Sequence, residues 1–154
     1  MPRWYALVTV LSSAIISESV YKGTDCSQLG NYTLRPKIRK GFATAILRRV
    51  YRDDLSRPLE YQCFLEGLAA LILENPGKPS KQECPFSVAT LPLYFEIKKV
   101  DGINIHVAIA AAMATWERFL QRMTPADSFG CNYLLDKHRK HKLLCLFSET
   151  HAYS

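Results

Sequence analysis

The chain has 154 residues, of which 48% are hydrophobic and 22% are charged, and its formal net charge is +6. This length suits one domain, and the hydrophobic fraction is sufficient for a core, which argues against global disorder. The positive surplus favours acidic partners such as glycosaminoglycans, anionic lipids or acidic proteins. It is too modest to indicate nucleic acid, and no aromatic–basic recognition motif accompanies it.

The N-terminus has the pattern of a secretory signal peptide. Arg3 precedes an apolar stretch, WYALVTVL and then SSAII. The small residues Ser17 and Ser19 mark a cleavage point before Val20, and Ser12 and Ala14 offer an alternative. We therefore expect residues 1–19 to be a signal peptide and residues 20–154 to form a single secreted, extracellular domain. The alternative is a buried first strand or helix of a cytosolic protein. The apolar run is too short for a stable membrane anchor.

The polar segment that follows carries Asn31-Tyr32-Thr33, an N-glycosylation sequon that has meaning only on the secretory route. Thr33 is also a candidate cap for an amphipathic helix that begins near Pro36 and ends near Val50, because proline is tolerated in the first turn.

Basic side chains fall mainly on the outer face of this first helix, at Lys37, Lys40, Arg48, Arg49 and Arg52. The expected role of this face is a solvated helix surface, and a binding face is the alternative.

A second helix is predicted from about Ser56, with Pro58 inside its first turn, to the stop signal Asn75-Pro76-Gly77. Apolar residues cover much of its circumference, so we expect it to be largely buried. Residues 88–100 then alternate as in a half-buried strand, and Pro92 limits the regular part to the residues after it or places it on a sheet edge.

A third helix follows Asp101-Gly102, with an apolar stripe from Ile105 to Met123 at spacings of four and three. Within that stripe, Trp116 is expected to be a core residue rather than a ligand platform. His106 is expected to be an interior or boundary histidine rather than a ligand.

Residues 129–147 are predicted to form a β-hairpin that folds back about His138, because two apolar runs flank a polar turn. This fold brings Cys131 and Cys145 to one face of neighbouring strands, within reach of a disulfide. The order helix, helix, strand, helix, hairpin indicates the α+β class.

The chain has five cysteines and no CxxC pair, which argues against a zinc ribbon or a thioredoxin-type site. In an oxidising compartment we expect the bridges Cys131–Cys145 and Cys63–Cys84, with Cys26 free or linking two chains into a dimer. If the signal peptide is wrong, five buried reduced thiols are the better interpretation.

The turn of the hairpin is a compact cationic segment made of Lys137, His138, Arg139, Lys140, His141 and Lys142. A solvated loop explains some of this charge. The hypothesis is an anion-binding tip for heparin-like or acidic surfaces, whose histidines add charge below about pH 6.5.

Catalytic and metal-binding patterns are not apparent in the sequence. The four histidines (His106, His138, His141 and His151) and the acidic residues have no spacing that suits a catalytic pair or a metal site. There is no glycine-rich phosphate loop, GxSxG or HExxH motif. We therefore expect no catalytic residue, no metal and no cofactor, and a protein that is not an enzyme.

Four stretches resemble the CAP superfamily of cysteine-rich secretory proteins, antigen five and pathogenesis-related proteins, and most of all the activation-associated secreted proteins of parasitic nematodes. They are the helix Ile38–Val50 after a cysteine, LEYQCFLEGLAALIL, AIAAAMATWERF, and FGCNY through LLCLF. Coccidian surface antigens have a related pattern of closing cysteines. The resemblance implies secretion, an α-β-α sandwich with three main helices and a small antiparallel sheet, and a role in host or extracellular interactions.

The departures from that family concern its cavity. The first helix reads Phe42-Ala43-Thr44-Ala45-Ile46-Leu47, without the family's histidine, and the GHYTQ-like segment before the closing strands is missing. We therefore expect a non-catalytic protein that binds an extracellular protein or an acidic glycan. The alternatives are a degenerate hydrolase-like or small lipid- or ligand-binding domain, and a cationic membrane-active protein. A packed centre around Ile46, Ile109 and Trp116 would favour the binding protein.

Overall fold

The computed structural model describes residues 21–50, 58–76 and 90–149. Its elements are η1 (Ser27–Tyr32), α1 (Pro36–Leu47), β1 (Glu60–Tyr61), α2 (Cys63–Glu74), β2 (Thr90–Lys98), α3 (Ile105–Leu120), β3 (Ser128–Leu135) and β4 (Lys140–Ser148). The expected signal peptide, residues 1–19, lies outside the described residues.

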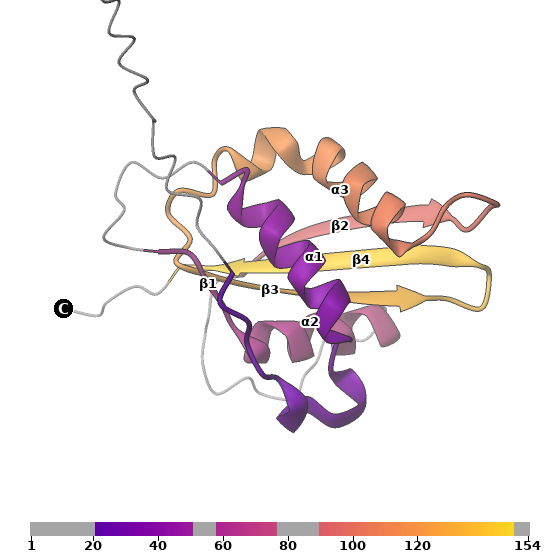
Figure 1. Cartoon of the computed structure of the whole chain (residues 1–154), viewed down its shortest axis with the longest axis horizontal. Helices are drawn as coiled ribbons and strands as arrows, with labels where there is room; N and C mark the ends of the chain where they lie inside the picture. Colours follow the sequence, from indigo (N-terminus) through magenta and orange to yellow (C-terminus); the bar gives the residue numbers. More distant parts are fainter. Residues whose placement is uncertain (1–20, 51–57, 77–89, 150–154) are drawn as a thin grey trace, which may run out of the picture.

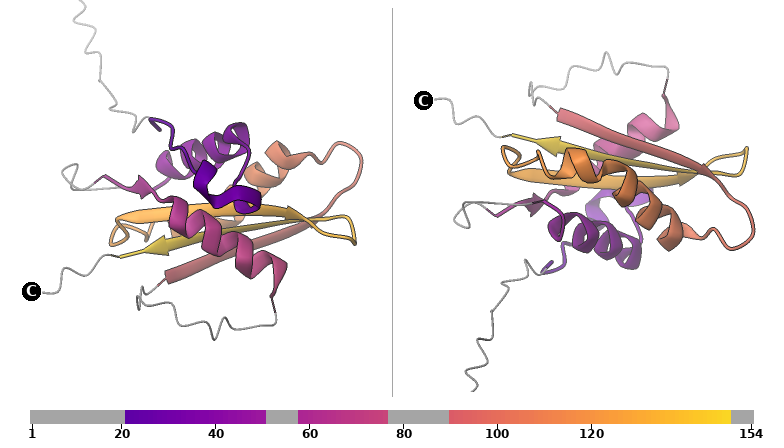
Figure 2. Two further views of the ribbon diagram at one scale, coloured as in Figure 1. Left: turned by 90° about the horizontal axis from the view of Figure 1, so that it is seen from below. Right: turned by 90° about the horizontal axis from the view of Figure 1, so that it is seen from above.

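Three layers make up the domain. The middle layer is a four-stranded sheet in the order β1-β3-β4-β2. Figures 1 and 2 show α1 and α3 on one face of this sheet and α2 on the other. The predicted α+β class and α-β-α sandwich with three main helices are therefore confirmed. The sheet is antiparallel except for the short β1, which runs parallel to β3.

Successive side chains of the closing hairpin, β3 and β4, point to opposite faces of the sheet. Leu143, Cys145 and Phe147 belong to the larger core under α1 and α3, whereas Leu144 and Leu146 pack in a smaller core with α2. This alternation follows from the period of two residues along a strand. Because both faces are covered, β4 reads as a continuous apolar run rather than as an alternating one.

The centre of the larger core is packed. Ile46, Ile109 and Trp116 are all buried in it, and the Trp116 indole N–H donates to the Tyr94 carbonyl at 3.2 Å. Trp116 is therefore a core residue, as the helical stripe predicts. Burial of this indole is compatible with its polarity because the N–H has a partner.

Helix ends differ in part from the predictions. The α1 cap position is Arg35, which makes no side-chain cap bond, and the Thr33 hydroxyl instead donates to the Cys26 carbonyl at 2.8 Å. At α3, the Asn104 side chain accepts from the backbone N–H groups of His106 and Val107, which makes it an N-cap that the sequence analysis missed.

The second helix begins later than predicted. Glu60 and Tyr61 pair with Ser128 and Phe129 as β1, and α2 starts only at Cys63. Tertiary strand pairing therefore overrides the helix-start signal of Pro58. The start of α2 lies directly against Gly130, where a Cβ atom would come within 2.5 Å of the Glu66 amide nitrogen, so only glycine fits there.

Two disulfides connect these elements. The bridge Cys131–Cys145 joins directly opposed residues of β3 and β4, as predicted. The second bridge joins Cys26 to Cys63, so the predicted pair Cys63–Cys84 is wrong, and so is a free Cys26 or a dimer through it. Cys84 lies outside the described residues. The turn η1 brings Cys26 beside the start of α2, a proximity that sequence separation does not reveal.

Candidate functional site

The hairpin end holds the predicted anion-binding residues, but they do not form one exposed cluster. Lys140 pairs with Glu96 at 2.7 Å across the sheet, and Lys142 pairs with Asp136 at 3.0 Å. His141 is only 2% exposed. The six-residue anion-binding tip is therefore corrected: among its residues, Lys137, His138 and Arg139 are the exposed ones.

His141 is buried because β4 begins at Lys140, and strand alternation then turns the next side chain inward. Its Nε2 donates to the Ile103 carbonyl, which only accepts, and its Nδ1 lies 2.9 Å from the Tyr133 hydroxyl. Both ring nitrogens are thus occupied within the protein.

Asp136 organises the turn itself. Its Oδ1 accepts from the backbone N–H groups of His138 and Lys140, both at 2.9 Å. Hydrogen bonds from these backbone groups and from Lys142, together with the charge of Lys142, keep the pKa of Asp136 below its usual value. Arg139 ends the turn with φ of 56°, a left-handed conformation that usually belongs to glycine.

The outer face of α1 carries the more open cluster of positive charge. A shallow hollow of about 410 Å³ is lined by Lys37, Lys40, Gly41, Thr44, Ala45, Arg48 and Arg49. We call its four cations, Lys37 and Lys40 on α1 and Arg48 and Arg49 in the turn directly after it, the α1 basic face. Among residues 21–50, 58–76 and 90–149, no acidic residue lines the hollow and none forms an ion pair with these cations.

One further cation of α1 points inward. Arg39 is 3% exposed and pairs with the fully buried Glu66, its Nε lying 2.6 Å from Oε2 and its Nη2 2.8 Å from Oε1. Glu66 also accepts from the Leu34 backbone N–H and the Tyr61 hydroxyl. Burial and the adjacent Glu66 carboxylate raise the pKa of Tyr61.

This buried pair was missed by the sequence analysis, although a signal exists. Arg39 lies beside the buried Ile38 and three and four residues before the buried Phe42 and Ala43, so its side chain turns toward the core. Through its contacts with Leu34, Arg39 and Tyr61, the buried Glu66 carboxylate joins α1, α2, β1 and the segment before α1.

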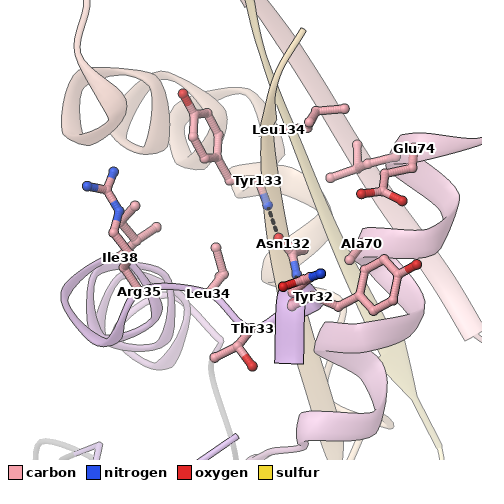
Figure 3. A pocket seen from close by; sticks show the side chains of 12 residues that line it. Tyr32, Thr33, Leu34, Arg35, Ile38, Ala70, Glu74, Asn132, Tyr133 and Leu134 are labelled. Carbon is pink, nitrogen blue, oxygen red and sulfur yellow. Dashed lines mark hydrogen bonds between the residues drawn. The ribbon is translucent and has the colours of Figure 1, made fainter. Parts of the chain in front are cut away.

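A cleft of about 220 Å³ opens where α1 begins and α2 ends, beside β3. Figure 3 shows Arg35 on one side of it, Glu74 on the other, and Asn132 between them. Asn132 is itself occupied, since its Nδ2 donates to the carbonyls of Tyr32 and Glu66. Burial raises the pKa of Tyr133, and the nearby Arg35 charge opposes that rise.

The predicted glycosylation sequon, Asn31-Tyr32-Thr33, lies within the described residues. Asn31 is exposed on η1, and the Thr33 of its sequon is half-buried.

Within the described ranges, no group of three or more His, Cys, Asp or Glu side chains is placed to hold a metal ion. The helices of the same ranges are all too short or too polar to cross a membrane.

Comparison with known proteins identifies one family. The family model described as Ancylostoma-associated secreted protein related matches residues 26–147, from the first bridged cysteine to the next-to-last residue of β4. No curated protein and no solved structure matches the chain. The match agrees with the expected resemblance to the CAP proteins and the activation-associated secreted proteins. The chain therefore belongs to the Ancylostoma-associated secreted protein related family.

Proposed function

We propose that this chain is a secreted, non-catalytic interaction protein that binds a sulfated or otherwise acidic extracellular glycan through the α1 basic face. The single observation that carries the proposal is the hollow on α1, which four cations line and which no acidic side chain of the described residues lines. Its position on an exposed helix makes these charges accessible to a large polyanion.

A glycan suits this surface better than a folded protein partner. The residues between the cations, Gly41, Thr44 and Ala45, are small and offer no aromatic or large aliphatic anchor. Protein interfaces concentrate their binding energy in such anchors, whereas dispersed cations on a shallow surface suit a chain of repeated anions.

The interior supports a binding role rather than catalysis. The centre around Ile46, Ile109 and Trp116 is buried, which is the arrangement expected of a binding protein. The buried carboxylate of Glu66 is engaged by Leu34, Arg39 and Tyr61, so it is held by structural contacts. Modulation of a host or tissue partner remains an extension of this proposal that rests on family analogy.

Heparin binding tests the proposal with two variants of equal charge. The first replaces Lys37, Lys40 and Arg48 with Glu, and the matched control replaces the exposed Lys98, Lys99 and Lys137 with Glu. We expect the first to weaken binding about tenfold or more, because each exposed charge pair contributes up to about 1 kcal/mol. The control has the same net charge, and its affinity for heparin should fall by less than that of the first variant. Equal loss in both variants, or a larger loss in the control, would refute a site on α1.

Secretion is tested separately by mass spectrometry of the product released from expressing cells. The proposal expects a mature chain that starts after residue 19, two intact bridges and a glycan on Asn31. Recovery of an uncleaved, fully reduced chain from the cytosol would contradict it.

A further inference from the structure

The edge of β3 that faces away from β4 is paired with β1 only at the start of β3. Cys131 and Cys145 are directly opposed with their Cα atoms 4.1 Å apart, the spacing of a pair that does not exchange hydrogen bonds. The odd-numbered residues of β3 therefore direct their backbone N–H and C=O groups away from β4. In agreement, the Phe129 carbonyl accepts from the Gln62 N–H on that side.

Pairing along this outer edge ends before the end of β3. β1 is in register only with Ser128 and Phe129, and the Tyr61 hydroxyl contacts the Cys131 carbonyl at 3.1 Å. At Tyr133 the backbone N–H donates to the Asn132 side chain at 2.7 Å. Beyond that point, no described strand lies beside the Tyr133 carbonyl and the Leu135 N–H.

The cleft described above lies along this uncovered part of β3. Arg35 and Ile38 at the start of α1 form one wall, Ala70 and Glu74 of α2 form the other, and Asn132–Leu134 form the floor (Figure 3). Residues 31–34 line the end of the cleft beside Asn132, where the Tyr32 carbonyl accepts from the Asn132 side chain. Beyond Asn132, the cleft is thus a slot in the place where the next strand of the sheet would lie, with a helix on each side.

We propose that this slot binds an extended peptide segment of a partner protein, which adds a strand to the outer edge of β3. Backbone groups of the segment pair with the Tyr133 carbonyl and the Leu135 N–H, as in other cases of strand addition. This site is separate from the α1 basic face and does not depend on the glycan proposal.

Charge complementarity specifies the segment. Arg35 and Glu74 are both exposed, and neither forms an ion pair within the described part of the chain. Successive side chains of an added strand point to opposite faces of the sheet. A segment with an acidic residue next to a basic one therefore places the acidic side chain toward Arg35 and the basic one toward Glu74.

The occupant is a flexible segment rather than the same edge of a second copy. Helices flank the slot on both sides, so a strand that carries its own flanking helices meets them before it reaches β3. Two copies of a chain with net charge +6 also repel each other.

The test is an NMR titration of the 15N-labelled protein with the peptide acetyl-Thr-Val-Asp-Lys-Val-Thr-amide. We expect shifts of the Tyr133 and Leu135 amide signals. A peptide N-methylated at alternate residues should bind at least tenfold more weakly, because it cannot pair along one edge. Leu135→Pro, which removes an N–H that points away from β4, should weaken binding to a similar degree while the β4 amide signals report an intact hairpin.

Charge exchange provides an independent check of the orientation. Arg35→Glu should weaken binding of this peptide about tenfold, and replacing the Asp of the peptide with Lys should restore it. The proposal is overturned if the titration leaves Tyr133 and Leu135 unshifted, if the N-methylated peptide binds as well as its parent, or if shifts occur only on the α1 basic face.

Discussion

The hairpin end and the outer face of α1 both concentrate positive residues, but they present them differently. At the hairpin end, residues 137–142 are six consecutive basic or titratable side chains, yet Lys140 and Lys142 pair with Glu96 and Asp136, and His141 is buried. On α1 and directly after it, Lys37, Lys40, Arg48 and Arg49 are spread over thirteen positions of sequence and line one hollow, to which no acid of the described residues contributes.

The difference follows from the geometry of the two elements. A strand sends alternate side chains to opposite faces and sets each residue opposite one on a neighbouring strand, so a run of charges is divided and partly neutralised. A helix returns to the same face after three or four residues, so separated cations gather on one side. Contiguity in sequence is therefore a poor guide to a charged surface, and periodicity is a better one.

The largest expected effect concerns Arg39, the α1 cation that does not belong to the outer face. Glu66→Ala leaves its guanidinium buried without a counter-charge, and it also removes the acceptor of the Leu34 N–H. We expect a loss of about 3–5 kcal/mol in the free energy of unfolding, measured by urea denaturation. Lys40→Ala on the exposed side of the same helix should change it by no more than about 0.5 kcal/mol.

The double variant Arg39→Met, Glu66→Leu sharpens this prediction. Replacing both buried charges with apolar side chains should lower the free energy of unfolding by less than Glu66→Ala alone does, because no unpaired charge remains. If Glu66→Ala cost less than about 1 kcal/mol, the pair would not be the buried anchor of α1 described above.

One disulfide closes the hairpin and the other joins the start of η1 to the start of α2, and their contributions to stability should differ. On a chain-entropy model, removing Cys26–Cys63, with a sequence separation of 37, should cost about 4 kcal/mol, and removing Cys131–Cys145, with a separation of 14, about 3 kcal/mol. Thermal unfolding of the paired Cys→Ala variants measures this order. A clearly larger loss for the hairpin bridge would show that its burial in the larger core outweighs loop length.

Acid should loosen the hairpin end without acting on the α1 basic face. The pKa values of Asp136 and Glu96 are lowered by hydrogen bonds and by Lys142 and Lys140. Their stabilisation is therefore present above the ordinary carboxyl pKa of about 4 and is lost as the pH falls through the lowered values.

Hydrogen exchange of the Lys140 amide at neutral and acidic pH measures this loss, after correction for the intrinsic exchange rate. Asp136→Asn should weaken the protection at neutral pH and reduce its dependence on acid. Protection that is unchanged across this range in the original protein would contradict the role of Asp136 in the turn.

The smallest expected effect concerns the turn backbone. Arg139 has a left-handed conformation, and glycine adopts it without steric cost. Arg139→Gly should therefore stabilise the protein by about 0.5–1 kcal/mol in denaturant unfolding. Lys137→Gly, at another exposed position of the same turn, should give no gain, and a loss of stability in Arg139→Gly would be inconsistent with this strain.

Much of the fold follows from patterns in the sequence. The stripes of α1 and α3, the edge position of Pro92 and the opposed cysteines of the hairpin depend on local periodicity, and the structure bears them out. The features that were missed depend on distant partners. Cys26 meets Cys63 only because η1 folds onto α2, and Glu60 becomes a strand residue only because β3 lies beside it.

The candidate site shows the same limit. The basic outer face of α1 was visible in the sequence, but the absence of an acid around its hollow is a property of tertiary structure within the described residues. Conversely, the hairpin run looked like one binding tip because its partners Glu96 and Asp136 cannot be assigned from spacing alone.

The most direct measurement is chemical-shift mapping of the 15N-labelled protein with a heparin-derived hexasaccharide. The proposed function predicts that the largest shifts fall on Lys37, Lys40, Thr44 and Arg48. It also predicts that Lys137, His138 and Arg139 change little at the same saccharide concentration. Largest shifts at the hairpin turn, with α1 unchanged, would contradict binding through the α1 basic face.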